Sequence, residues 1–259
     1  MRFPVIRMPK IPAAAVLLAA AALIGPLSGT SSAATFNVSP TQVFLSGAET
    51  STLLTIRNES AEPLRFQLSV FAWTQNAAGE MVLTPTNDVV FFPALLTLGP
   101  NEERKVRIGR VVAAGEVERT YRIFVEELPP LDAVVNAGAS VRLLTRMGVP
   151  VFVRPSKDVT APSVEGVTAD LEAVRFTVAN TGTIHFVPDR VVVRGLAHGA
   201  PVFERSVQAW YVLAGGRREF QLALADLACA GATSIQVEAT IAGTTIDKRV
   251  DLPAGACRP

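Results

Sequence analysis

The segment Leu64-Arg65-Phe66-Gln67-Leu68-Ser69-Val70-Phe71-Ala72 decides the fold class, because its apolar residues recur at every second position. A period of two places alternate side chains on opposite faces, which predicts a half-buried β-strand. The same alternation recurs at 52–57, 105–108 and 121–126. Turn-forming residues separate these segments, at 58–60, 76–79 and 99–101. Regularly spaced strands with turns between them favour a β-sandwich.

The alternation stops at the polar, proline-bearing segment 154–158 and then resumes, which predicts a linker between two domains. The segments with strand character in the second half are 174–178, 190–194, 208–213, 219–224 and 235–241. We therefore predict an all-β chain with a first domain at 35–154 and a second at 159–259. No stretch of helical period and length follows residue 34.

The N-terminus has the pattern of a secretory signal peptide. Basic residues at positions 2, 7 and 10 precede an apolar stretch at 11–24 and a small-residue run at 28–34. We predict residues 1–34 as the signal peptide, with cleavage after Ala33 or Ala34. The alternative is an uncleaved N-terminal anchor. The apolar stretch is shorter than the roughly 20 residues that span a bilayer, and no second such stretch follows, so stable membrane insertion is not expected.

Charge and cysteine content restrict the possible partners. Removing the three basic residues of the signal peptide leaves a mature net charge of about −2, which gives no general attraction to nucleic acid or anionic lipid. The chain has two cysteines, Cys229 and Cys257. In an exported protein they are most simply a disulfide, and the alternative is a pair of free buried thiols.

Residues that could perform catalysis are sparse. The chain has two histidines, His185 and His198, and neither lies at a metal-binding spacing from other ligand-type residues. No nucleophile-elbow motif and no phosphate-binding glycine loop is present in the sequence. The sequence therefore predicts a protein that is not an enzyme and that needs no metal or cofactor.

The order of several segments resembles the PapD-like pilus chaperones. Residues 36–45 resemble the first strand of that family, and 54–58 the second. Residues 92–100 resemble the proline-containing approach to its central turn, 118–130 the sixth strand, and 149–155 the end of the seventh strand with the hinge. The match covers about 120 residues, and the second domain agrees only in size and strand content. The pair Tyr121-Arg122 and the ending Pro150-Val151-Phe152 are most similar to the divergent archaic branch.

This resemblance implies two immunoglobulin-like β-sandwich domains joined by a short hinge in a boomerang arrangement. It implies a periplasmic chaperone that binds, folds and caps pilus subunits by donor-strand complementation and delivers them to an outer-membrane usher. In that mechanism an extended strand is added to the open edge of an incomplete sandwich. The expected partners are pilus subunits and the usher, and the free protein can also cap itself as a dimer.

The donor in this family is the seventh strand, so we expect it at 140–153. The residues expected to fill the subunit groove share one face of that strand; they are Val141, Leu143, Thr145, Met147 and Val149. The preceding segment 131–139 is interpreted as a loop that stays mobile until a subunit binds. The alternative is that 140–153 is simply the last strand of a closed sandwich.

The residues that usually hold the subunit's terminal carboxylate are absent. By the segment matches, the two basic positions of the family fall at Gln42 and Pro150. An arginine can replace them, since guanidinium binds carboxylate through paired, charge-assisted hydrogen bonds. The candidate anchors are Arg122, Arg146 and, as a neutral hydrogen-bond donor, Gln42. The alternative is that both arginines lie on a solvated face or pair with the acidic residues at 126 and 127.

A second function class is compatible with an exported sandwich protein, namely a structural or adhesion subunit of a surface appendage. Such a subunit lacks its own last strand and carries an N-terminal extension with alternating apolar residues. Here the residues after the predicted cleavage site lead directly into the first strand. A monomeric, soluble mature chain favours the chaperone, because a subunit polymerises or misfolds alone.

Overall fold

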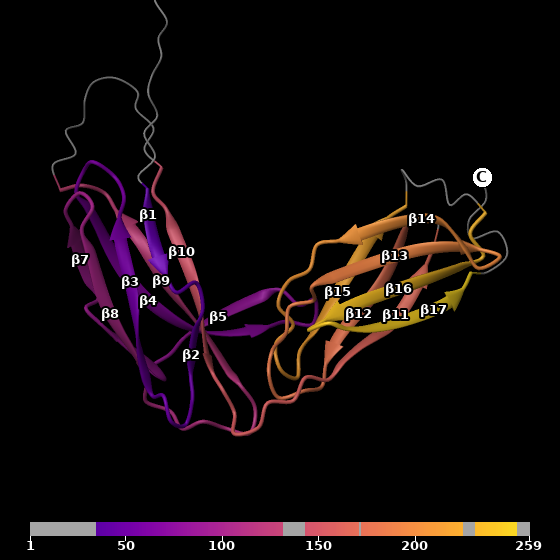
Figure 1. Cartoon of the computed structure of the whole chain (residues 1–259), viewed down its shortest axis with the longest axis horizontal. Coiled ribbons are helices and arrows are strands. Elements are labelled where there is room, and N and C mark those ends of the chain that lie inside the picture. The colour runs from indigo at the N-terminus through magenta and orange to yellow at the C-terminus, as the bar shows by residue number, and fades with distance from the viewer. Residues whose placement is uncertain (1–34, 132–142, 171, 225–230, 253–259) are drawn as a thin grey trace, which may run out of the picture. The chain divides into compact units, whose positions relative to one another are not determined.

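The computed structural model describes residues 35–131, 143–170, 172–224 and 231–252, and within these ranges every regular element is a β-strand (Figure 1). The strands of the first half are β1 (Phe36–Ser39), β2 (Val43–Leu45), β3 (Ser51–Asn58), β4 (Leu64–Gln75), β5 (Met81–Pro85), β6 (Val89–Phe92), β7 (Leu95–Leu98), β8 (Glu103–Arg110), β9 (Arg119–Leu128) and β10 (Arg146–Val153). Those of the second half are β11 (Pro162–Ala169), β12 (Ala173–Asn180), β13 (Arg190–Ala197), β14 (Ala200–Val207), β15 (Arg217–Ala223), β16 (Ser234–Ile241) and β17 (Thr244–Asp251). The all-β prediction is confirmed.

The first sandwich consists of two sheets with a shared core. One sheet has the order β1-β3-β8-β6, and the other has the order β2-β10-β9-β4-β5 with β7 also paired to β4. The alternation in 64–72 places Leu64, Phe66 and Leu68 in this core, at most 3% exposed. The pattern that predicted the strand therefore also identifies the face it buries.

The first strand of this sandwich is divided between the two sheets. β1 pairs antiparallel with β3. After Pro40 the chain crosses to the other sheet, where β2 pairs parallel with the end of β10, Val43 opposite Val151 and Leu45 opposite Val153. The short strand β2 therefore covers one edge of β10 over three residues only.

The second sandwich pairs the sheet β11-β12-β15 with the sheet β14-β13-β16-β17. Its core is also apolar and includes the stacked rings of Phe176 and Phe220, whose centroids are 5.1 Å apart. The two cores are separate clusters, and the strands of both sandwiches belong to one compact unit. The fold is thus two immunoglobulin-like sandwiches, as the family resemblance implied.

The strand predicted at 208–213 is wrong. This segment is irregular, and its one sheet-like contact among the described residues is an isolated bridge between Val212 and Phe186. The side chain of Gln75 forms hydrogen bonds with the backbone of this segment. Gln75 Nε2 donates to Tyr211 O at 2.8 Å, and Leu213 N donates to Gln75 Oε1 at 2.8 Å. Of its apolar residues, Tyr211 and Leu213 pack against Trp73 and Phe152 of the first sandwich, whereas Val212 packs in the core of the second.

Each sandwich contains one buried asparagine that fixes a corner. Asn58 ends β3, and its Nδ2 donates to three main-chain carbonyls, those of Glu62, Leu98 and Gly99. Asn180 ends β12, where its Nδ2 donates to the carbonyls of Ile184 and Val212. Buried carbonyls of turns need such donors, since water cannot reach them.

Several predictions fall on residues that the structure does not describe. These are the signal peptide at 1–34, both cysteines, and Val141 of the expected donor strand. Within the described ranges, no helix has the length and apolar composition required to span a bilayer.

Candidate functional site

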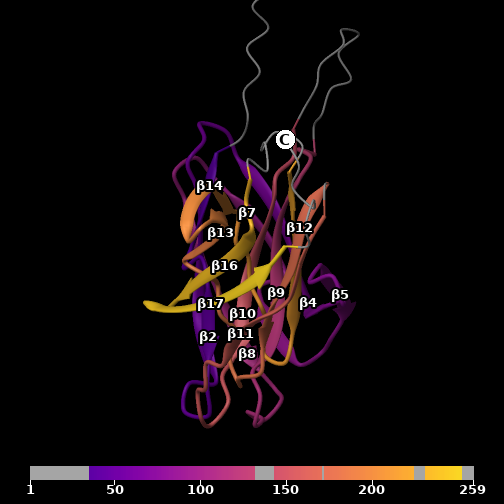
Figure 2. The ribbon, with the colours of Figure 1, turned by 90° about the vertical axis from the view of Figure 1, so that its right-hand side faces the viewer.

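The strand β10 has an edge that is open over most of its length. It pairs with β9 from Arg146 to Val153, whereas β2 reaches its other edge only from Val151 onward. In both views β9 and β10 run side by side (Figures 1 and 2). Among the described residues no strand pairs with the second edge between Arg146 and Pro150. Unpaired edges are sites where another extended chain can add.

The two faces of β10 have different surroundings. Val149 and Val151 are at most 2% exposed and Met147 is half-buried, all three in the core of the first sandwich. The opposite face carries Gly148 and Pro150. Met147 and Val149, expected to fill a subunit groove, therefore fill their own sandwich in this structure.

The residues before β10 are exposed and lie outside the sheet. The strand expected to begin at residue 140 begins at Arg146, and residues 143–145 have no regular structure. Leu143 is 62% exposed and Leu144 46% exposed, and Thr145 is also exposed. Leu143 and Thr145 occur at the same alternate positions as Met147, so they would continue its face if the strand were extended.

Arg122 is a buried cation on the outer face of β9. It is 8% exposed, and its guanidinium lies 4.4 Å from the ring centroid of Trp73 and 5.8 Å from that of Trp210. Its Nε has no hydrogen-bond partner, and Nη1 makes one long bond, 3.4 Å, to Gly148 O. Burial lowers the pKa of Arg122 from its usual value, an effect that nearby Tyr211 opposes.

No carboxylate of the described residues lies within ion-pair distance of Arg122. A buried charge is costly unless an opposite charge compensates it. The stacked aromatic rings compensate in part, since a guanidinium interacts favourably with aromatic faces. The arrangement suits an anion supplied from outside the chain.

The other two candidate anchors are already engaged. Arg146 Nε lies 3.3 Å from Glu126 Oε2, and its guanidinium stacks 3.9 Å from the ring centroid of Phe124. Gln42 Nε2 donates to the hydroxyl of Tyr211 at 2.6 Å. Of the three candidates, Arg122 is therefore the one that is a buried cation without a carboxylate partner among the described residues.

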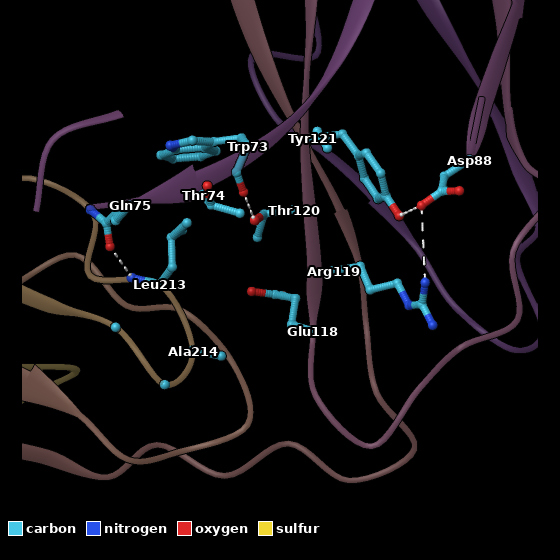
Figure 3. Close-up of a pocket in the computed structure, with 13 residues that line it drawn as sticks. Trp73, Thr74, Gln75, Asp88, Glu118, Arg119, Thr120, Tyr121, Leu213 and Ala214 are labelled. Atoms are coloured by element: carbon cyan, nitrogen blue, oxygen red, sulfur yellow. Dashed lines mark hydrogen bonds and ion pairs between the residues drawn. The ribbon is translucent and has the colours of Figure 1, made fainter. Parts of the chain in front are cut away.

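A pocket of about 380 Å³ lies beside the start of β9 (Figure 3). Its polar groups bond one another: Tyr121 donates to Asp88 Oδ2 at 2.8 Å, and Thr120 Oγ1 donates to Trp73 O at 2.5 Å. Burial, followed by the hydrogen bond to Asp88, raises the pKa of Tyr121 to about 12. These contacts tie strands together, and the described residues contain no cluster of three or more metal-ligand side chains.

His185 is held by a buried carboxylate. Its Nδ1 lies 2.5 Å from Glu118 Oε2, its backbone N donates to the same oxygen at 2.9 Å, and its ring stacks on Phe152 at 3.7 Å. These contacts are those of a structural histidine.

Sequence reasoning missed one buried acid near the open edge, Glu127, which is 1% exposed. A signal was present, because alternation from Tyr121 through Ile123 and Val125 puts position 127 on the core face. The contacts of Arg122 with two tryptophan rings were also not foreseen, since Trp73 and Trp210 are far apart in sequence.

The fold and site together define a two-sandwich protein with an open strand edge beside a buried cation. Residues 35–158 match the family model described as pili and flagellar-assembly chaperone, PapD N-terminal domain. The match covers the whole first sandwich, from β1 to β10, which is therefore an N-terminal domain of the PapD type.

Solved structures support the same fold. A chain of the CsuC–CsuE chaperone–tip adhesion subunit pre-assembly complex from archaic chaperone–usher Csu pili of Acinetobacter baumannii matches with a TM-score of 0.56 at 17% identity, over 83% of this chain and 97% of that one. The Escherichia coli chaperone DraB matches with a TM-score of 0.52 at 20% identity, over 86% and 98%. The Pseudomonas aeruginosa chaperone CupB2 matches with a TM-score of 0.52 at 18% identity, over 84% and 100%. No curated protein sequence matches significantly.

Proposed function

We propose that this chain is a periplasmic chaperone that caps pilus subunits by donor-strand complementation. The observation that carries the proposal is the open edge of β10 between Arg146 and Pro150. An incomplete sandwich exposes a groove and two unpaired strand edges, and a strand with a free edge can pair with it. The exposed Leu143 and Thr145, together with Val141, are the side chains that enter the groove.

Arg122 is the residue that holds the subunit's terminal carboxylate in this proposal. Its burial, its unpartnered Nε and its distance from any described carboxylate support the assignment. A carboxylate bound there forms charge-assisted hydrogen bonds in a poorly solvated place, where they are strong. Arg146 is not assigned this role, because Glu126 already neutralises it.

The wider role follows from the family. We propose that residues 1–34 direct export, that Cys229 and Cys257 form a disulfide, and that residues 154–158 link the domains at 35–154 and 159–259. The chain then delivers captured subunits to an outer-membrane usher. In support, one similar structure is a pre-assembly complex of a chaperone with a tip adhesion subunit, and another is the Salmonella enterica SafA pilin in complex with the SafB chaperone.

The test is co-expression in the periplasm with a candidate pilin, followed by purification through a tag on the pilin. Wild type should give a soluble 1:1 complex. The double variant Val141→Asp with Leu143→Asp should give none, because two carboxylates cannot enter an apolar groove without a large desolvation cost. If this variant still captures the pilin, the donor strand is assigned wrongly.

Two matched controls separate strand donation from general damage. Leu144→Asp places the same charge at the neighbouring position of opposite alternation, and we expect capture to persist. For the anchor, Arg122→Ala should lower affinity about 100-fold, the effect of losing a strong charge-assisted pair. Arg146→Ala should change affinity by less than about threefold. Equal losses at both arginines would contradict the anchor assignment.

A further inference from the structure

The ladder between β9 and β10 stops before β9 itself ends. β9 continues to Leu128 and remains paired with β4 there, Glu127 opposite Phe66 and Leu128 opposite Arg65. On its other side the last paired residues are Glu126 and Arg146. Among the described residues, Leu128 therefore has a neighbouring strand on one side only, and the register would place Leu144 opposite it on the other.

The next step of the ladder is half-made. Glu127 N donates to Thr145 O at 2.9 Å, which is the bond that a regular antiparallel pair would form. The return bond, from Thr145 N to the main-chain oxygen of Glu127, is replaced. Thr145 N instead donates to the side-chain Oε2 of Glu127 at 3.3 Å. The carboxylate thus accepts the hydrogen bond from the amide that would otherwise continue the ladder.

We propose that Glu127 is a ladder stop that keeps the first residues of the donor segment out of the sheet in the free protein. It is a positioning residue: it acts on Thr145 and, through it, on the exposed Leu143 and Leu144. The inference rests on the proposed function only in taking β10 as the strand offered to subunits.

A stop of this kind has a physical benefit. A long, flat, unpaired edge invites pairing with the wrong chain, and proteins limit this by keeping edge strands short. With the ladder ending at Arg146, the open edge of β10 spans 146–150. A subunit that supplies a second partner strand can compensate for extending it, whereas solvent cannot.

The experiment compares three full-length proteins purified from the periplasm: wild type, Glu127→Leu and Glu127→Gln. Leucine has no acceptor, so Thr145 N should turn to the main-chain oxygen of residue 127 and the ladder should extend. Two-dimensional NMR then detects a new contact between the Hα atoms of Leu128 and Leu144, with slower amide exchange at Thr145. Glutamine keeps an oxygen acceptor and should show neither change.

The consequence for capture is measured with a purified candidate pilin. A pre-extended donor needs less ordering on binding, so Glu127→Leu should associate with the pilin about fivefold faster than wild type. Glu127→Gln should match wild type. Glu126→Gln is the control for removing a carboxylate one position away, and it should not extend the ladder.

The outcomes separate the two proposals. Absence of the Leu128–Leu144 contact in Glu127→Leu, or its presence in Glu127→Gln, overturns the ladder stop. An extended ladder with an unchanged association rate overturns its role in capture. If wild type binds no pilin at all, the proposed function fails, while the NMR comparison still decides whether Glu127 stops the strand.

Discussion

The two sandwiches share a fold and a buried asparagine at the end of one strand, but they differ in the other polar groups that they bury. In the first sandwich the buried charged residues are Glu118, Arg122 and Glu127. In the second, the buried polar residues that the structure describes are neutral, Asn180 and Ser234. Burying a charge costs more stability than burying a neutral polar group. The difference suggests that the first sandwich carries the binding function and that the second supports it.

The largest loss of stability should come from replacing the buried asparagine that each sandwich contains. Asn58→Ala removes three hydrogen bonds, those to the carbonyls of Glu62, Leu98 and Gly99, so we expect the free energy of unfolding to fall by about 3–4 kcal/mol. Asn180→Ala should cost about 2–3 kcal/mol, since it serves two carbonyls. Urea denaturation measures both. A negligible change at either asparagine would show that the corners are not equivalent.

A pH effect should appear in the first sandwich. The pKa of Tyr121 is raised from 10.0 to about 12, so the neutral phenol stabilises the fold fully below pH 10 and loses this contribution as pH rises through 12. The expected loss is about 2–3 kcal/mol. It is measured as the difference in unfolding free energy between wild type and Tyr121→Phe from pH 9 to 12. A constant difference over that range would contradict the assignment.

Two glycines allow a steric comparison between the sandwiches. A Cβ on Gly195 would lie 2.1 Å from Phe203 Cε1, and one on Gly148 would lie 2.9 Å from Phe124 Cε1. We expect Gly195→Ala to lower the melting temperature more, at a cost of about 2 kcal/mol against about 1 kcal/mol for Gly148→Ala. Only Gly148→Ala should also weaken pilin capture, because its Cβ would crowd Arg122 Nη1 at 3.3 Å. If Gly148→Ala lowered the melting temperature more than Gly195→Ala, the ring of Phe203 would have to move aside at little cost.

The smallest expected effects on stability distinguish a buried arginine, Arg122, from an ion-paired arginine, Arg194. Arg122→Met removes a desolvated charge, so we expect no loss of stability, although capture should fail. Arg194 bonds Glu204 at 2.7 Å and Glu238 at 2.8 Å, and Arg194→Met should cost about 0.5–1 kcal/mol without affecting capture. Calorimetry and pilin binding on the same samples decide this. A clear destabilisation by Arg122→Met would point to a structural arginine.

Local alternation predicted the strands, because each strand buries one face against its own sandwich. It failed where the contact is distant: Tyr211 and Leu213 of the segment 208–213 pack against Trp73 and Phe152 of the other sandwich. For the described residues 143–145, the expectation that they belong to the donor strand met a different obstacle, since a side chain on the neighbouring strand accepts the hydrogen bond of the Thr145 amide. Arg122 was a candidate because it interrupts an apolar stretch, and its burial agrees with that reasoning.

The parallel pairing of β2 with the last three residues of β10 sets one end of the edge to which a guest strand can add. Beyond Pro150 the edge is already covered, and Pro150 itself has no N–H to offer. At about 3.3 Å per residue, the open edge from 146 to 150 measures roughly 17 Å. Because the first strand crosses between the sheets, β2 blocks the edge of β10 beyond Pro150. A strand of any partner that pairs with β10 must therefore end at this position.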